Sequence, residues 1–251
     1  NNGVQLFAPG KTELDNLRFV TFIVETLKAV YDHNGLLKAS IVSATNAHRL
    51  GGYEAPPAII STFLGKTVSD LLDHVENSSD DDIMAMSGKK SMKLDIPSIP
   101  ELLIDNTDRN RTSPFAFTGN RFEFRSVGSN LSISGPNTIL NAILADALKS
   151  FADELEKSNN FDSDLHKLIK REITNHGKIL FNGNGYGAEW IVEAEKRGLK
   201  NYRTTPDAME HYLDEKNIKL LGGRGIYTED EMRSHYEIKL EKYCQNLNIE
   251  V

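Results

Sequence analysis

The sequence predicts an α+β fold, in which a small antiparallel sheet packs under helices and a mainly helical segment follows. Three observations predict it. Long stretches repeat their apolar residues with the period of an amphipathic helix. Two short strand patterns surround a glycine turn near residue 119. From about residue 159, helix patterns alternate with short loops. We therefore expect one region over residues 1–158 and a second, helical region over residues 159–251.

The first predicted helix covers residues 13–32, where the apolar spacing gives a broad buried face and Thr12 is the expected N-cap. The apolar stretch 36–44 fits either a helix or a strand, because the period does not decide between them. Residues 49–57, RLGGYEAPP, contain two glycines and two prolines and predict a loop.

The middle of the chain predicts a short helix over residues 67–75, with Thr67 as its cap, and a polar loop over residues 76–97. Two strands, 115–117 and 121–125, are expected to form a hairpin around Thr118-Gly119-Asn120.

Pro136 opens the next predicted helix, which carries one main apolar stripe. The stripe consists of Leu140, Leu144, Leu148, Phe151 and Leu155, and Ile139, Ile143 and Ala147 widen it. Four further helices are expected after residue 159, at residues 161–176, 187–197, 206–214 and 228–245. In the last of them, Thr228 and Glu231 have the spacing of a capping box.

Composition excludes several classes of protein. The 251 residues are 39% hydrophobic and 26% charged, and no apolar run approaches the roughly 18 residues of a membrane span. No export signal opens the chain, so we expect a cytoplasmic protein, and Asn1 in place of a methionine suggests a piece of a longer one. A net charge of −7 argues against a general nucleic-acid binder. The single cysteine, Cys244, excludes a disulfide framework, and its helical setting predicts a packed side chain.

The segment RFEFR, residues 121–125, is the most informative candidate site. In a strand, Arg121, Glu123 and Arg125 share one face, and the two phenylalanines anchor the other face. A carboxylate can bind Mg²⁺, and guanidinium groups bind phosphate oxygens, so this face suits phosphoryl transfer. A half-exposed strand with a local salt bridge is the simpler alternative.

Two further segments carry candidate residues. Arg111, in the segment DRNRT, would approach the same face if the two segments pair, although a solvent-facing arginine is an equal alternative. Glu54, in the loop RLGGYEAPP, suits a lid or a general base, whereas a surface glutamate is usually only solubilising.

The glycine-rich segment FNGNGYG, residues 181–187, resembles a dinucleotide-binding turn only superficially. No second strand ending in an acidic residue follows about 20 positions later, so a simple turn is favoured. The histidines lack metal-ligand spacing, and no GxSxG elbow provides the start of a hydrolase triad.

Three segments together resemble type III glutamine synthetases. They are RLGGYEAPPAIISTFLG (residues 49–65), DRNRTSPFAFTGNRFEFRSVGS (108–129) and FNGNGYGAEW (181–190). The resemblance extends over essentially the whole chain. It implies the C-terminal half of a glutamine synthetase catalytic domain over residues 1–158 and the start of a helical C-terminal extension over residues 159–251.

On the substrate side, the resemblance implies that Glu54 is the flap glutamate, which closes the site and takes a proton from ammonium. It also implies that Arg49 binds the carboxylate of glutamate and that Arg125 is a substrate-side arginine. The loop between Arg49 and Glu54 is one residue shorter than in other types of the family.

On the nucleotide side, the resemblance implies that Arg111 stabilises the transferring phosphoryl group and contacts the nucleotide. Arg121 is expected to contact the nucleotide phosphates, and Glu123 to bind a divalent metal. At Ala116 other types of the family carry another arginine, so the nucleotide contacts are expected to differ here.

The implied activity is ATP-dependent ligation of glutamate and ammonia through γ-glutamyl phosphate, with Mg²⁺ or Mn²⁺, in a homo-oligomer of stacked rings. The family's other metal ligands correspond to positions upstream of Asn1, so we expect the isolated 251-residue chain to be inactive. Three alternatives stay open: a γ-glutamyl ligase for another amine, a non-catalytic module that binds to rings, and, distantly, a dinucleotide-dependent enzyme.

Overall fold

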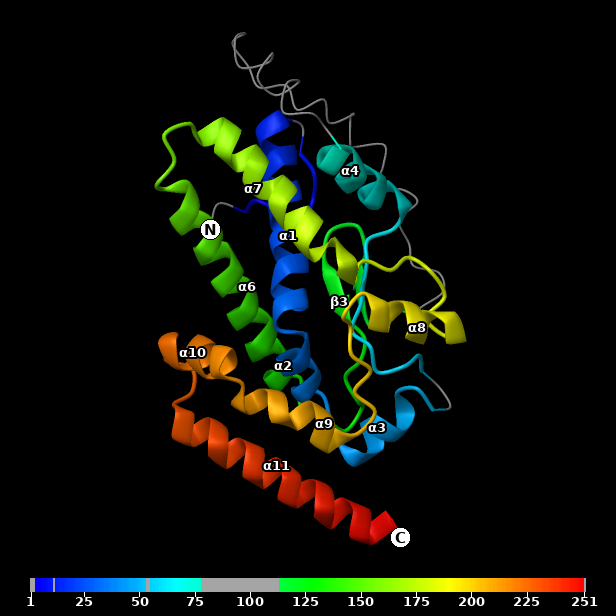
Figure 1. Cartoon of the computed structure of the whole chain (residues 1–251). Coiled ribbons are helices and arrows are strands. Elements are labelled where there is room, and N and C mark those ends of the chain that lie inside the picture. Colours follow the sequence, from blue (N-terminus) through cyan, green and yellow to red (C-terminus); the bar gives the residue numbers. More distant parts are fainter. Residues whose placement is uncertain (1–2, 11, 53–54, 78–112, 251) are drawn as a thin grey trace.

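A computed structural model describes residues 3–10, 12–52, 55–77 and 113–250. Three helices form its framework: α1 (Glu13–Asp32), α6 (Ser134–Leu155) and α7 (Phe161–His176) pack against one another beside a small sheet. In Figure 1, α7 crosses in front of α1, and α6 lies to the left of α1. The expected cap of α1 is confirmed, because Thr12 and Asp15 form a reciprocal capping box. The presence of many helices beside one small sheet confirms the coarse α+β prediction.

The sheet has three short strands in the order β1 (Thr62–Phe63), β2 (Phe115–Phe117) and β3 (Phe122–Phe124). β2 and β3 form the expected antiparallel hairpin, closed by Gly119, whose φ of 101° suits glycine. β1, however, runs parallel to β2, so the prediction of an antiparallel sheet was wrong for this strand. The connection from β1 to β2 is a long crossover, which permits parallel pairing, and it contains α4 (Lys66–Asn77).

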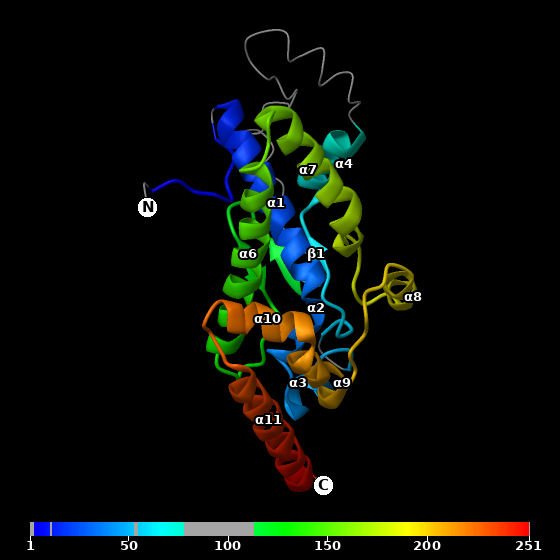
Figure 2. The same ribbon diagram turned by 60° about the vertical axis from the view of Figure 1, so that its left-hand side comes forward.

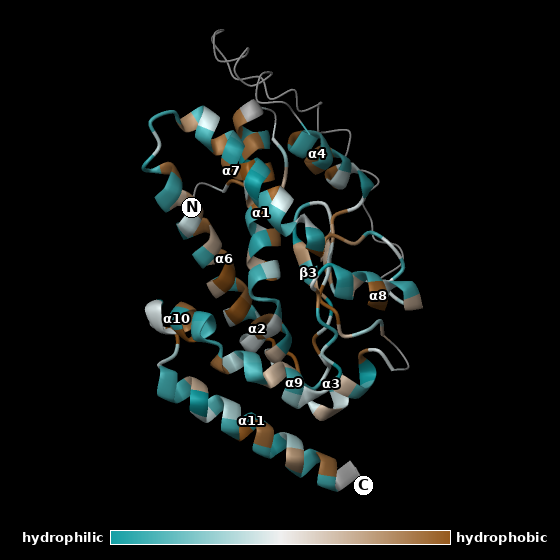
Figure 3. Ribbon diagram, viewed as in Figure 1, coloured by the Kyte–Doolittle hydropathy of each residue, from teal (hydrophilic) through white to brown (hydrophobic). Residues whose placement is uncertain are grey.

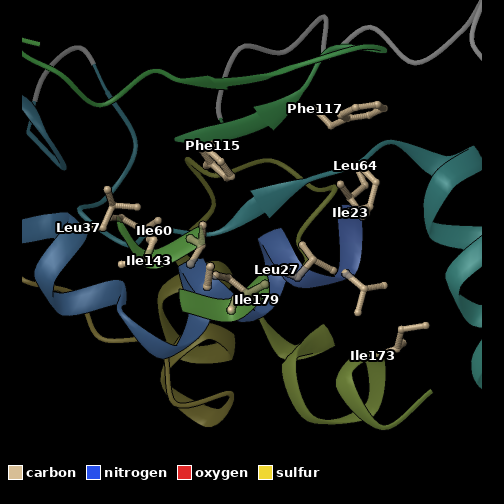
Figure 4. Packing of buried hydrophobic residues seen from close by; sticks show 14 of the residues in the cluster. Ile23, Leu27, Leu37, Ile60, Leu64, Phe115, Phe117, Ile143, Ile173 and Ile179 are labelled. Atoms are coloured by element: carbon tan, nitrogen blue, oxygen red, sulfur yellow. The ribbon is translucent and has the colours of Figure 1, made fainter. Parts of the chain in front are cut away.

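The core lies between the sheet and the framework helices, as Figure 4 shows. Ile23 and Leu27 from α1 and Phe115 and Phe117 from β2 are buried in it. Ring stacking strengthens the hairpin, because Phe122 of β3 lies parallel to Phe115 with 4.8 Å between ring centroids.

The buried face of α6 lies within the expected arc, but it is centred on the residues that widen the stripe. Ile139, Ile143 and Ala147 are buried, whereas Leu140 and Leu144 are only half-buried and line a groove of about 410 Å³. The apolar residues of α6 cover a broad arc, and the period alone could not show which edge of that arc faces α1.

Three shorter helices follow α1, and they test the predictions for the stretch 36–44 and for Thr67. Of the ambiguous stretch 36–44, residues 36–39 are helical in α2 (Asn34–Ala39), and residue 44 begins α3 (Ala44–Arg49), which precedes the glycine-rich loop. Thr67 is not a cap, since α4 already begins at Lys66. Of the polar loop expected at residues 76–97, the first two residues end α4, and the rest lies outside the described residues.

The expected helices after residue 159 are present. α7 matches its predicted bounds, and α8 (Ala188–Lys196), α9 (Thr205–Met209) and α11 (Glu229–Glu250) correspond to the other three, whereas α10 (Glu215–Gly223) was not expected. Short 3₁₀ turns, Gly177–Ile179 and Glu210–Leu213, follow α7 and α9.

Helix α11 lies at one end of the molecule and projects beyond the framework in Figure 2. Its capping box is confirmed, because the Thr228 backbone N–H donates to Glu231 at 2.8 Å. Figure 3 shows a largely hydrophilic ribbon for this helix, and Cys244 on it is exposed. The prediction of a packed cysteine was wrong, because the solvent-facing side of α11 carries it.

The region after residue 159 packs directly onto the region before it. Besides the contact of α7 with α1, the backbone N–H of Phe181 donates to the Thr62 carbonyl at 2.9 Å and extends the sheet beyond β1. None of the helices in the described residues is long and apolar enough to cross a lipid bilayer.

Candidate functional site

The charged face of β3 has the arrangement that its alternation predicts. Glu123 lies between two arginines, 3.6 Å from Nη2 of Arg121 and 3.2 Å from Nη2 of Arg125. Phe122 and Phe124 point to the other face, where they contact the ring of Phe115. Arg121 is largely exposed, with 71% of its side chain accessible, whereas 24% of the Arg125 side chain is accessible. Ligands can therefore reach this face from solvent.

Arg49 ends α3, just before the glycine-rich loop. Its Nε donates to the amide oxygen of Asn46 at 3.0 Å, and its Nη2 donates to the carbonyl of Ser126 at 3.3 Å. Ser126 directly follows Arg125, so the structure brings Arg49 beside the chain that leaves β3.

The loop after Arg49 needs its glycines. Gly51 has a φ of 81°, and a Cβ on Gly52 would lie 2.3 Å from the carbonyl oxygen of His48. The turn is closed by a hydrogen bond of 3.2 Å from the Gly51 N–H to the Ala55 carbonyl. The backbone therefore turns immediately after Arg49, and this turn fixes the position of the Arg49 Cα.

Two predicted site residues, Glu54 and Arg111, lie outside the described residues. Of the six, the structure thus places Arg49, Arg121, Glu123 and Arg125. Whether all of them surround one anionic pocket stays a prediction.

Asn46 was missed by the sequence analysis. It is 2% exposed, and its Nδ2 donates to two carbonyls, Ile41 at 2.7 Å and Ser126 at 2.9 Å. Its position one turn before Arg49 on a short helix is the only signal in the sequence that could have suggested a contact between the two.

Lys38 was also missed. It is 1% exposed on α2. Burial, together with the positive charge of Arg49, lowers the pKa of Lys38 to about 7. Its neighbours Leu36, Leu37 and Ala39 are equally buried, so α2 is enclosed on all sides. The apolar residues on both sides of Lys38 in the sequence were the signal that could have indicated its burial.

The carboxylate of Glu123 can supply one ligand to a divalent cation. In the part of the chain that the structure describes, no three acidic, histidine or cysteine side chains gather as a metal site. Glu123 itself is engaged with Arg125 through two contacts of 3.2–3.3 Å. Glu123 can therefore supply one ligand to a metal ion, and the described residues do not form a complete metal site.

The glycine-rich segment after α7 is a turn that docks on the sheet, as favoured above. The Oδ1 of Asn182 accepts from the backbone N–H groups of Leu64 and Gly65, at 3.2 and 3.1 Å. Phe181 stacks on Trp190 of α8 with 3.7 Å between ring centroids. These contacts give the segment a structural explanation without a nucleotide.

Comparisons with known proteins agree with the resemblance. Residues 164–251 match a family model described as the glutamine synthetase C-terminal domain. Over its whole length, the chain is 44% identical to a glutamine synthetase from Bacteroides fragilis, 40% to the type-3 glutamine synthetase from Dictyostelium discoideum and 39% to a glutamine synthetase from Butyrivibrio fibrisolvens. The chain spans about a third of each relative, namely 35%, 34% and 35% of their lengths.

Proposed function

The chain belongs to the glutamine synthetase family, and from this premise we propose that it forms part of an ATP-dependent ligase that makes glutamine from glutamate and ammonia. The observation that carries the proposal is the face of β3, where Glu123 lies between Arg121 and Arg125. Such a face suits a reaction in which anionic groups must be held close together.

The proposed reaction has two steps. The γ-carboxylate of glutamate attacks the γ-phosphorus of ATP, which gives γ-glutamyl phosphate and ADP, and ammonia then displaces phosphate from the acyl carbon. Arg49 and Arg125 bind and orient the glutamate, while Arg121 holds nucleotide phosphate oxygens. For Arg111 we propose charge stabilisation during phosphoryl transfer, and for Glu54 the removal of a proton from ammonium.

Glu123 would hold Mg²⁺ or Mn²⁺ together with ligands outside the described residues. Such an ion, when bound, neutralises phosphate charge. Because the described residues supply one carboxylate at this face, we expect the 251-residue chain alone to lack ligase activity. Assembly into stacked rings and a cytoplasmic location stay predictions.

The test uses the protein expressed from the complete open reading frame that contains this sequence, called the complete protein below. Glutamine formation from glutamate, ammonia and ATP is expected, and Glu123→Gln should lower kcat at least a hundredfold. Lys149→Gln on α6, an exposed residue that pairs with Asp153 on the same helix, is the matched control and should leave kcat unchanged.

A panel of primary amines separates the alternatives. Preference for methylamine or a longer amine over ammonia would indicate a γ-glutamyl ligase of different specificity. A complete protein that turns over none of these amines, yet co-elutes with intact rings of a relative, would point to a non-catalytic module and would contradict the proposal.

A further inference from the structure

We propose that Asn46 is a positioning residue for the site, because it fixes one edge of the Arg49 guanidinium and leaves the other edge for substrate. The inference rests on the proposed function. It begins from the hydrogen bonds that Arg49 forms with other described residues, which lie on one side of its planar group. Nε donates to Oδ1 of Asn46 at 3.0 Å, and Nη2 donates to the carbonyl of Ser126 at 3.3 Å.

A guanidinium has five N–H groups and can present two different edges to carboxylates. The contacts with Asn46 and Ser126 occupy the edge formed by Nε and Nη2. The opposite edge, formed by Nη1 and the second N–H of Nη2, suits a bidentate carboxylate. Among the described residues, the protein thus binds the inner edge of the Arg49 guanidinium and leaves its outer edge for a carboxylate.

Asn46 can act as a rigid support because its own amide is fully committed. Its two N–H groups donate to the carbonyls of Ile41 and Ser126, at 2.7 and 2.9 Å, while its oxygen accepts from Arg49. The side chain is 2% exposed, so water does not compete for these bonds. Asn46 therefore connects the end of α2 with the chain after β3 and sets Arg49 between them.

The backbone on both sides restricts Asn46 further. Its N–H donates to the capping hydroxyl of Ser43 at 3.1 Å. On the other side, a Cβ added to Gly128 would lie 3.3 Å from the Asn46 amide, so glycine leaves just enough room for it. No aspartate can replace Asn46 in this role, since a carboxylate cannot donate to two carbonyls.

The experiment measures steady-state kinetics of the complete protein with Asn46→Ala. We expect the KM for glutamate to rise about tenfold to a hundredfold, which is the loss typical of a hydrogen bond to a charged group. The KM for ATP should change less than threefold. In the Arg49→Ala background, Asn46→Ala should have no further effect on the KM for glutamate, because the residue that it positions is gone.

Asn217→Ala is the matched control. Asn217 is also a buried asparagine with two side-chain hydrogen bonds, to His33 and to the His211 carbonyl, far from β3. It should lower thermal stability by a similar amount and leave the KM for glutamate unchanged. If both variants raise that KM equally, Asn46 is only structural and the inference is wrong.

A gentler variant covers the case in which Asn46→Ala does not fold. Gly128→Ala adds one methyl group against the Asn46 amide and should raise the KM for glutamate a few fold, with little change in stability. An unchanged KM in this variant would also contradict the inference. Absence of glutamine synthesis by the wild-type complete protein would instead refute the proposed function, so the two failures are distinguishable.

Discussion

The Nδ1 atom of His176 lies 3.0 Å from Oε2 of Glu172, one turn earlier in α7. The other ring nitrogen lies 3.4 Å from the carboxylate of Asp32 at the end of α1, so this imidazole bridges two helices. Burial lowers the pKa of His176, but the two carboxylates outweigh it and raise that pKa to about 9. For Glu172, burial alone would raise the pKa. Hydrogen bonds from His176, Arg171 and Lys28 outweigh this effect and hold the pKa of Glu172 at about 2.

The first prediction concerns the pH dependence of stability. A histidine with a raised pKa stabilises the fold fully below its unfolded pKa of about 6.5, and this contribution is lost as the pH rises through about 9. His176→Ala should therefore lower the free energy of unfolding by about 1 to 3 kcal/mol more at pH 6 than at pH 10. Urea unfolding at the two pH values measures the difference.

The exposed His74 on α4 gives the control for this prediction. His74→Ala should change stability by the same small amount at both pH values. Equal losses for His176→Ala at the two pH values would mean that its contribution comes only from ring packing on Tyr31.

The second prediction concerns Glu25, which is 0% exposed on α1. Neither of its carboxyl oxygens has a hydrogen-bond partner within the described residues. Burial and the nearby Glu172 carboxylate raise the pKa of Glu25 to about 8. Its cost to the fold therefore grows as the pH rises from about 4.3 to about 8.

Replacement of this carboxyl by a neutral amide should remove that cost. Glu25→Gln should raise the free energy of unfolding by about 1 to 3 kcal/mol at pH 8.5 and leave it unchanged near pH 4. Chemical denaturation at both pH values tests it. The exposed Glu237→Gln should show neither effect, and a pH-independent change for Glu25→Gln would contradict the prediction.

The third prediction concerns the buried Lys38. Because its pKa is lowered to about 7, the folded state pays the full cost of this charge below pH 7, and the cost declines toward about pH 10.4. Lys38→Met should therefore stabilise the protein by about 1 to 3 kcal/mol at pH 6.5 and by much less at pH 9.5. Thermal unfolding at the two pH values measures this, with the exposed Lys196→Met as control. Destabilisation at pH 6.5 would show that an anionic partner holds the ammonium.

The fourth prediction concerns the docking of the glycine-rich turn. Asn182 accepts from Leu64 and Gly65 and donates to Ser69 at 2.8 Å, so Asn182→Ala removes three hydrogen bonds between distant segments. We expect a loss of about 1 to 2 kcal/mol and faster amide exchange at residues 64 and 65. Asn184→Ala, which removes only a local bond to the Tyr186 N–H, should leave that exchange unchanged.

Local signals determined which parts of the fold could be predicted. The periods of α1 and α7 and the caps at Thr12 and Thr228 are local, and so is the alternation that places Glu123 between Arg121 and Arg125. All these features match the structure. The family resemblance, in turn, depended on short segments whose residues are close in sequence.

Features that depend on distant partners were not predictable. The parallel direction of β1 is set by its crossover to β2, and the buried arc of α6 by how that helix packs on α1. Asn46 became visible only when the structure placed Ser126, 80 residues later, beside it. No local pattern records contacts of this kind.

The bond from Phe181 to Thr62 has a consequence for any cut between the two regions. β1 pairs with a segment of the region after residue 159, and α7 from that region lies against Glu25 and Asp32 of α1. Each region therefore buries part of the other. Limited proteolysis in the short linker between α6 and α7 should therefore yield two pieces that stay associated and melt together in a single cooperative transition.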